Sequence, residues 1–281
     1  FATMNFSPRF APRHQLLHVD HDAAVLGRNY DCLPVHGDAQ QVCRALLEGL
    51  AGEGKAPTPA WLAALQAAEP RVFEPAHARS SARPIRPERL MHELEHALPA
   101  DACVVADIGT SCLFVAHCLR FTPPQRCYLP MAWSCMGHPL GAALGVRLGS
   151  GKPTVCVAGD AAFLAKGMEL HAAVELGVDR FVCVVLSNRG HGLVRAGTAA
   201  LITSERRVED GTFSVQPDIA ALGRAVGAEG VRVSDPNELR AAITHGLGCG
   251  RPCVIEVVVD PHAMPPMADR LQGLAKSGAA S

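Results

Sequence analysis

The sequence lacks any apolar run that approaches the roughly 20 residues of a membrane-spanning helix, and it lacks a strong charge of either sign. Its 26 Lys and Arg residues oppose 27 Asp and Glu residues, and no basic cluster dominates any stretch. We therefore expect neither a membrane nor nucleic acid as a partner. Residues 1–14 are mixed in character and contain two prolines, unlike a secretory signal peptide, which predicts a cytoplasmic protein.

Cysteine is plentiful, but its spacing does not match a zinc site, and several of the 11 cysteines lie inside apolar stretches. A chain of 281 residues can bury a large core without cross-links. We therefore expect reduced, mostly buried thiols rather than a disulfide scaffold. With 48% hydrophobic and 19% charged residues, the composition indicates a globular protein.

Proline marks the organisation of the chain. Six prolines lie between residues 57 and 87, which predicts a linker at 52–86. Residues 1–51 show one expected strand (15–19) and one expected helix (38–50, with Asp38 as its N-cap), and a short helix is expected at 59–68 within the linker. Regular alternation of strands and helices fills residues 87–281.

The alternation predicts an α/β fold, with a parallel sheet covered by helices on both faces. Apolar strands are expected at 102–106, 154–158, 181–186, 230–233 and 253–259. Helices are expected at 87–97, 111–119, 136–148, 163–176, 218–226 and 236–247. We interpret residues 193–213 as a mobile loop.

Polar residues follow two of these strands. One strand ends in Gly159-Asp160, and the next ends in Ser187-Asn188-Arg189-Gly190-His191-Gly192. Ligands of parallel α/β sheets bind at such strand ends, and a helix start beside a carboxylate suits a phosphate bridged by Mg²⁺. Asp160, Asn188 and a backbone carbonyl near Gly190 would supply the oxygens. The alternative for Gly159-Asp160 is an ordinary turn in which Asp160 is an N-cap.

The same residues resemble a known signature. Gly159-Asp160 followed by Asn188 is similar to the Gly-Asp-Gly…Asn-Asn pattern of thiamine diphosphate-dependent enzymes. Residues 131–145 resemble the segment that precedes this pattern in acetolactate synthases and related 2-oxo acid decarboxylases. Residues 10–13, 16–20 and 37–39 resemble the end of their central domain. The resemblance implies that residues 1–51 are the C-terminal part of a central α/β domain, and that residues 87–281 form the thiamine diphosphate-binding domain.

The resemblance also implies roles for individual residues. Mg²⁺ would be bound by Asp160, Asn188 and the Gly190 carbonyl. Met136 would bend the cofactor, which places its amine against the reactive carbon, and the Ser134 carbonyl would accept a hydrogen bond from the aminopyrimidine. The diphosphate would be lined by Gly109, Thr110, Ser111, Gly159, Ala161 and Ala162. Ala161 departs from the Gly of the pattern, which requires a negative φ at that position.

The resemblance further implies what this chain would need from elsewhere. The glutamate that activates the aminopyrimidine belongs to a separate pyrimidine-binding domain in this group, and we find no equivalent of that domain in this sequence. Glu169 is a poor substitute because it lies within an expected helix. We therefore expect a second polypeptide, within a homo- or hetero-oligomer, to supply the glutamate. The small part of the central domain leaves FAD binding open.

The resulting hypothesis is a transferase or lyase that decarboxylates a 2-oxo acid and transfers the acyl carbanion to a second carbonyl, as acetolactate synthases do. The alternatives are a simple 2-oxo acid decarboxylase and a non-catalytic cofactor-binding subunit. A nucleotide-binding protein is disfavoured because no strand leads into a Gly-x-Gly-x-x-Gly loop. His191 and His138 are the catalytic candidates, with a packed or surface histidine as the alternative for each. Trp133 is interpreted as a core or interface residue.

Overall fold

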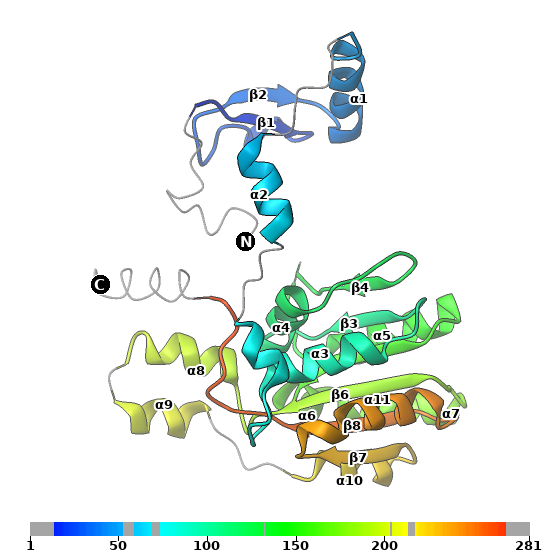
Figure 1. Cartoon of the computed structure of the whole chain (residues 1–281). Coiled ribbons are helices and arrows are strands. Elements are labelled where there is room, and N and C mark those ends of the chain that lie inside the picture. The colour runs from blue at the N-terminus through cyan, green and yellow to red at the C-terminus, as the bar shows by residue number, and fades with distance from the viewer. Residues whose placement is uncertain are drawn as a thin grey trace. The chain divides into compact units, whose positions relative to one another are not determined.

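The computed structural model describes residues 14–52, 59–68, 74–131, 133–202, 204–212 and 217–267 (Figure 1). The chain forms two compact units, Phe1–Pro70 and Arg71–Ser281. Their boundary falls within the predicted linker 52–86. The assignment of these units to a central and a cofactor-binding domain stays a prediction.

The first unit contains a pair of parallel strands, β1 (Leu17–Asp20) and β2 (Leu33–His36), with the short helix η2 (Ala23–Val25) between them. Helix α1 (Ala39–Gly49) begins as predicted at Asp38, whose side chain accepts a hydrogen bond from Gln41 N at 3.0 Å. Helix α2 (Ala60–Ala68) follows. The prediction of a single strand here was wrong, because β2 has only four residues, one of them Pro34, and gives little pattern. Residues 10–13, part of the resemblance, lie outside the described residues.

The second unit is built on six parallel strands in the order β4-β3-β5-β6-β8-β7. They are β3 (Cys103–Ala106), β4 (Arg126–Tyr128), β5 (Thr154–Gly159), β6 (Phe181–Ser187), β7 (Glu229–Val233) and β8 (Cys253–Val258). Strands β3, β5 and β6 are direct neighbours, so their carboxyl ends meet at one edge of the sheet. The predicted fold class is confirmed.

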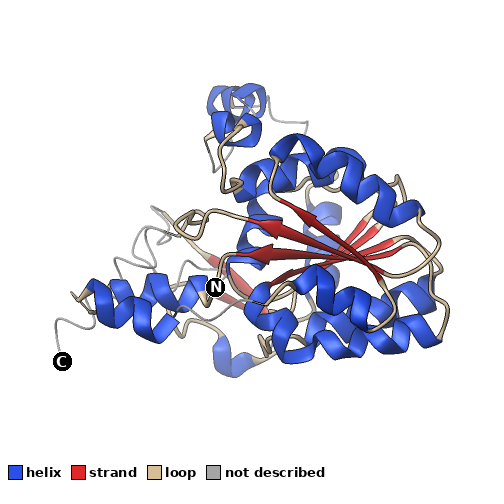
Figure 2. Cartoon of the chain, turned by 90° about the horizontal axis from the view of Figure 1, so that it is seen from below, coloured by secondary structure: helices blue, strands red, loops and turns tan. Residues whose placement is uncertain are grey.

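Helices cover both faces of this sheet (Figure 2). Successive strand residues alternate between two cores: Val104 packs into one and Val105 into the other. The first core is completed by α3 (Pro87–Ala97), α4 (Thr110–Cys118) and α11 (Leu239–Gly248). The second is completed by α5 (His138–Ser150), α6 (Asp160–Lys166), α7 (Leu170–Glu175) and α10 (Ile219–Ala225). Within the described ranges, no helix is long and apolar enough to cross a membrane.

Three segments differ from the sequence expectations. The helix expected at 163–176 is divided into α6, the turn η4 (Gly167–Glu169) and α7, because the backbone of Lys166 leaves the helical region with a φ of −140°. The interpretation of 193–213 as a loop was wrong, since it contains α8 (Gly192–Ala199) and α9 (Glu205–Thr212). The expected helix 236–247 begins as the turn η5 (Pro236–Glu238).

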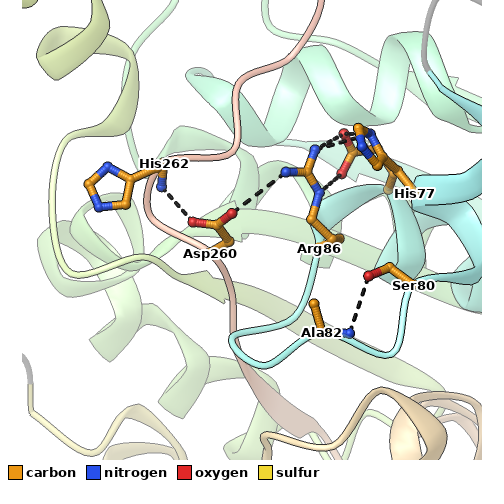
Figure 3. Close-up of polar contacts among 7 residues, drawn as sticks. His77, Ser80, Ala82, Arg86, Asp260 and His262 are labelled. Atoms are coloured by element: carbon orange, nitrogen blue, oxygen red, sulfur yellow. Dashed lines mark hydrogen bonds and ion pairs between the residues drawn. The ribbon is translucent and has the colours of Figure 1, made fainter.

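The segment before α3 is fastened to the end of β8. After the short helix η3 (Pro75–Arg79), Ile85 N donates to the Val258 carbonyl at 3.0 Å, and Asp260 N donates to the Ile85 carbonyl at 2.9 Å. Arg86 lies between two carboxylates: it donates to Glu88 at 2.7 Å, and its guanidinium is 3.6 Å from Asp260 (Figure 3). This anchoring holds the start of the second unit against the carboxyl end of its sheet.

The eleven cysteines all lie within the described ranges, and all are free thiols. Cys103, Cys156, Cys183 and Cys253 are buried on the central strands, as expected for small hydrophobic residues.

Candidate functional site

The loops that follow β3, β5 and β6 surround one cavity of about 230 Å³. All eleven predicted cofactor-binding residues line it, and so does the candidate His191. The structure thus brings together residues that are up to 81 positions apart in the sequence (109 and 190), although their binding of a cofactor stays a prediction. Among the described residues, the lining consists of Ile108, Gly109, Thr110, Ser111, Ser134, Met136, Gly159, Asp160, Ala161, Ala162, Asn188, Gly190, His191, Gly192, Leu193 and Val194.

Asp160 holds two of these loops together. It is the first residue of α6 and only 2% exposed. Its carboxylate accepts hydrogen bonds from Ala161 N at 2.8 Å, Arg189 N at 2.6 Å and Gly190 N at 3.2 Å. Burial raises the pKa of this carboxyl above its ordinary value, while the N–H groups, including that of Asn188, act in the opposite direction. These bonds hold the carboxylate against the loop that begins at Asn188.

Asn188 carries an unusual amide oxygen. This atom is buried without a hydrogen-bond partner, and it is the only such side-chain nitrogen or oxygen among the described residues. An unsatisfied buried acceptor costs about 1–3 kcal/mol, so an acceptor of this kind in a cavity is suited to binding a ligand. Amide and carboxylate oxygens are ligands that Mg²⁺ accepts. The donor set of Asp160 and Asn188 therefore fits a hard divalent cation.

The backbone around Asn188 is shaped to produce this arrangement. Arg189 adopts a left-handed conformation with φ of 64°, and the N–H groups of Arg189 and Gly190 both donate to the Asp160 carboxylate. Two residues later, a Cβ on Gly192 would lie 2.8 Å from Asn188 Nδ2 and 3.5 Å from Thr110 Oγ1. Glycine at 192 is therefore required for the Asn188 side chain to occupy its place.

Ser187, which directly precedes this loop, is held by a hydrogen bond to Glu256. Glu256 is completely buried on β8, where it accepts a hydrogen bond from the Ser187 hydroxyl at 3.0 Å and one from Ala220 N at 3.2 Å. Arg232 lies 3.1 Å from the same carboxylate. The Ser187 hydroxyl is thus engaged within the protein, as expected for a position that is not a metal ligand. Sequence reasoning missed Glu256, although a charged residue within the apolar run 253–259 was a signal.

Ser134 and Met136 also line the cavity. Ser134 has a positive φ of 53°, and Met136 is partly exposed at the rim. Trp133 is 91% exposed, so it is not a core residue of this chain. Ala161 lies within α6 and is not among the described residues with positive φ, so alanine fits where the family pattern has glycine.

The other candidate residues are only partly gathered here. His191 lines the cavity, and its N–H donates to the Thr212 carbonyl at 2.9 Å. His138 is exposed at the start of α5 and does not line the cavity. Glu169 is exposed on the turn η4, also outside the lining. His191 is therefore the better placed of the two candidate histidines.

A larger cavity of about 580 Å³ lies between α8, α9 and the residues after β8. Its polar lining mixes basic and acidic side chains: Arg195, His262, Glu205 and Glu209. The unpartnered Asn188 oxygen belongs to the smaller cavity. We therefore assign the candidate functional site to the smaller one.

Comparison with known proteins agrees with this geometry. Residues 107–257 match the family described as "Thiamine pyrophosphate enzyme, C-terminal TPP binding domain". A putative acetolactate synthase large subunit of Mycobacterium tuberculosis is 30% identical over 274 residues, covering 94% of this chain and 46% of that protein. The acetolactate synthase isozyme 3 large subunit of Escherichia coli is 29% identical over 252 residues, covering 87% and 43%.

A probable acetolactate synthase large subunit of Methanocaldococcus jannaschii is 25% identical over 268 residues, which is 92% of this chain and 44% of the relative. The chain thus spans less than half the length of these relatives. The family match covers more than half of the chain and includes the loops that follow β3, β5 and β6 and surround the cavity. The chain therefore belongs to the thiamine pyrophosphate (thiamine diphosphate) enzymes, and it carries their C-terminal cofactor-binding domain.

Proposed function

We propose that this chain supplies the diphosphate- and metal-binding half of the active site of an acetolactate synthase-like carboligase. In the proposed reaction, a 2-oxo acid loses CO₂, and the remaining acyl group is joined to a second carbonyl compound. The relatives named acetolactate synthase support this class of reaction. The observation that carries the proposal is the buried, unpartnered Asn188 amide oxygen in the same cavity as the Asp160 carboxylate.

In this proposal, Mg²⁺ is held by Asp160, Asn188 and the Gly190 carbonyl. Gly109, Thr110, Ser111, Gly159, Ala161 and Ala162 line the place of the diphosphate. The cation offsets the repulsion between the Asp160 carboxylate and the phosphate groups. The arrangement is supported by the lining of the cavity, in which all these residues take part. Thiamine diphosphate, when bound, supplies an electron sink for the breaking carbon–carbon bond.

Two further groups act on the organic part of the cofactor. The Met136 side chain, which lines the cavity, would hold the cofactor in a bent form, and the Ser134 carbonyl would accept a hydrogen bond from its aminopyrimidine. His191 holds a proton for the substrate at the cavity wall. His138 remains a weaker candidate, because it contributes nothing to the lining.

We also propose that turnover requires a second polypeptide, within a homo- or hetero-oligomer, that carries the pyrimidine-binding domain and its activating glutamate. The described part of the cavity lining contains a single carboxylate, that of Asp160, whose oxygens face the metal loop. The exposed residues Trp133, Met131 and Met136 beside the cavity are consistent with a covering partner.

Turnover assays separate this proposal from its alternatives. The chain, alone and in the assembly from which it is purified, is incubated with thiamine diphosphate, Mg²⁺ and pyruvate, and products are followed by NMR. A new carbon–carbon bond in the product of the assembly is the expected result. Release of the aldehyde alone would identify a simple decarboxylase. Cofactor binding without consumption of any 2-oxo acid would identify a non-catalytic subunit, and failure to bind the cofactor would contradict the proposal as a whole.

A further inference from the structure

Asp107 is a buried carboxylate with no role in the proposed chemistry. It follows β3 directly, is 1% exposed, and does not line the cavity. Its Oδ1 accepts a hydrogen bond from Ile108 N at 2.7 Å, and its Oδ2 accepts one from Gly137 N at 2.8 Å. A single carboxylate therefore joins two backbone segments that are about thirty residues apart.

The two joined segments both contribute to the wall of the cavity. On one side, Asp107 is continuous with the loop 108–111, and its own carbonyl accepts the Ser111 hydroxyl at 3.0 Å. On the other side, Gly137 directly follows Met136. Asp107 N also donates to the Val157 carbonyl at 2.7 Å, which fixes the carboxylate relative to β5.

Gly137 allows little freedom in this contact. Its φ of 80° is left-handed, and a Cβ there would lie 2.6 Å from Lys166 Cγ and 3.1 Å from the Ala162 carbonyl oxygen. The turn at Gly137 is thus held between Asp107 on one side and α6 on the other. Because Ala162 also lines the cavity, three of its walls converge at this glycine.

We propose that Asp107 is a positioning residue, which holds the cofactor-bending segment Ser134–Met136 in register with the diphosphate loop 109–111. The inference rests on the proposed function, because it assigns these two segments to different parts of one cofactor. Displacement of a contact by about 1 Å can reduce catalysis by about 100-fold. A carboxylate suits the task because it has two acceptor oxygens and no donor, whereas an amide has one acceptor oxygen.

The test variant is Asp107→Asn, which preserves the shape of the side chain but accepts only one of the two N–H groups. Hydrogen–deuterium exchange is measured on peptides covering residues 107–112 and 133–138, with and without Mg²⁺ and inorganic pyrophosphate. Pyrophosphate lacks the organic part assigned to Ser134 and Met136. Slower exchange at 133–138 therefore reports coupling between the two walls rather than direct contact.

In the parent chain, we expect Mg²⁺ and pyrophosphate to slow exchange in both peptides. In Asp107→Asn, we expect the slowing of exchange to persist at 107–112 and to be lost at 133–138. The affinity for pyrophosphate should stay within about threefold of the parent, whereas the affinity for thiamine diphosphate should fall by about tenfold or more. A carboxylate that only stabilised the fold would lower the melting temperature and leave the coupled response intact. Slowing of both peptides in the variant would overturn the inference.

Two further variants complete the design. Glu93→Gln is the matched control, because Glu93 is also a buried carboxylate, held on α3 by Arg89 and Arg240 away from the cavity, and it should keep the coupled response. Gly137→Ala disturbs the other partner of the hydrogen bond between Gly137 N and Asp107, and it should also abolish the slowing of exchange at 133–138. This variant keeps the test decisive if Asp107→Asn does not fold. Absence of any pyrophosphate binding by the parent would overturn the proposed function, and this inference with it.

Discussion

Asn188 and Asp160 illustrate how a functional site departs from the rules that stabilise the rest of the fold. Elsewhere among the described residues, buried polar side-chain atoms have partners, whereas the Asn188 oxygen has none. Asp160 remains a buried acid supported by backbone N–H groups. Both side chains gain their missing stabilisation if a cation binds between them.

The unpartnered oxygen of Asn188 predicts that Asn188→Ala weakens ligand binding without lowering the stability of the ligand-free protein. Removal of the unpartnered acceptor avoids a penalty of about 1–3 kcal/mol, so the free energy of unfolding without ligand should not fall. The additional stability conferred by Mg²⁺ and pyrophosphate should be largely lost. Urea unfolding with and without these ligands measures both quantities. Asn237→Ala, at an exposed position, is the control. A marked loss of stability without ligand would show that the amide oxygen is structural.

Asp107 predicts a pH dependence with a defined sign. Burial raises its pKa, so its contribution to stability is fully present below the unfolded pKa of about 4 and is lost as the pH rises through the folded pKa. Asp107→Asn removes this pH-dependent contribution to stability. The melting temperature of the variant minus that of the wild type should therefore rise as the pH increases from 4.

Asp179→Asn provides a control of opposite sign. The hydrogen bond from Arg147 lowers the pKa of Asp179, so that its contribution is lost as the pH falls through the folded pKa. The corresponding difference in melting temperature should fall with rising pH. Thermal unfolding of Asp107→Asn between about pH 4 and 7, and of Asp179→Asn between about pH 2.5 and 5, checks the two signs. Trends of the same sign in the two variants would contradict the account.

At the residue scale, the sequence predicted the polar groups that follow β5 and β6 and missed those whose role depends on distant partners. Asp160 and Asn188 follow apolar strands in neighbouring βα units, so their meeting at one sheet edge could be inferred from topology. Asp107 and Glu256 act through partners 30 and 69 positions away, Gly137 and Ser187 respectively. Such contacts depend on loop geometry that no local pattern contains.

Among the elements, α8 matters most to the site, because its first residues line the cavity directly after Asn188, Gly190 and His191. Its sequence, Gly-Leu-Val-Arg-Ala-Gly-Thr-Ala, contains two glycines and no acidic residue in the first turn, so the sequence alone gives little indication of a helix. Packing against α9 gives the helix support that its sequence does not provide. Strand β4 was also missed, because its three residues are too few to form a recognisable sequence pattern.

The two glycines of α8 predict contrasting effects of alanine. Gly192→Ala would place a Cβ 2.8 Å from Asn188 Nδ2, so we expect affinity for Mg²⁺ and pyrophosphate to fall by about tenfold or more while the fold persists. Gly197→Ala meets no atom within 4 Å and should stabilise the helix by about 0.5–1 kcal/mol with unchanged binding. Calorimetric titration of both variants tests this contrast, and equal affinities would contradict the steric account.

For the whole molecule, the second unit carries the cofactor-binding domain, and the described residues place its candidate site at one edge of a six-stranded sheet. The alternation of apolar strands and helices was sufficient to predict this architecture, because parallel sheets buried on both faces have continuous apolar strands. The partner that covers the site cannot be inferred from such patterns, since its residues belong to a different segment. That part of the account rests on the resemblance and stays a proposal.

The central claim is that Asp160 and Asn188 bind a divalent cation together with thiamine diphosphate. Its most direct test is isothermal titration of thiamine diphosphate into the chain, with and without Mg²⁺, for the parent, for Asp160→Ala and for the exposed control Asp179→Ala. We predict Mg²⁺-dependent binding by the parent and the control, and its loss in Asp160→Ala with the fold preserved by circular dichroism. Absence of binding by the parent, or unchanged binding by Asp160→Ala, would contradict the account.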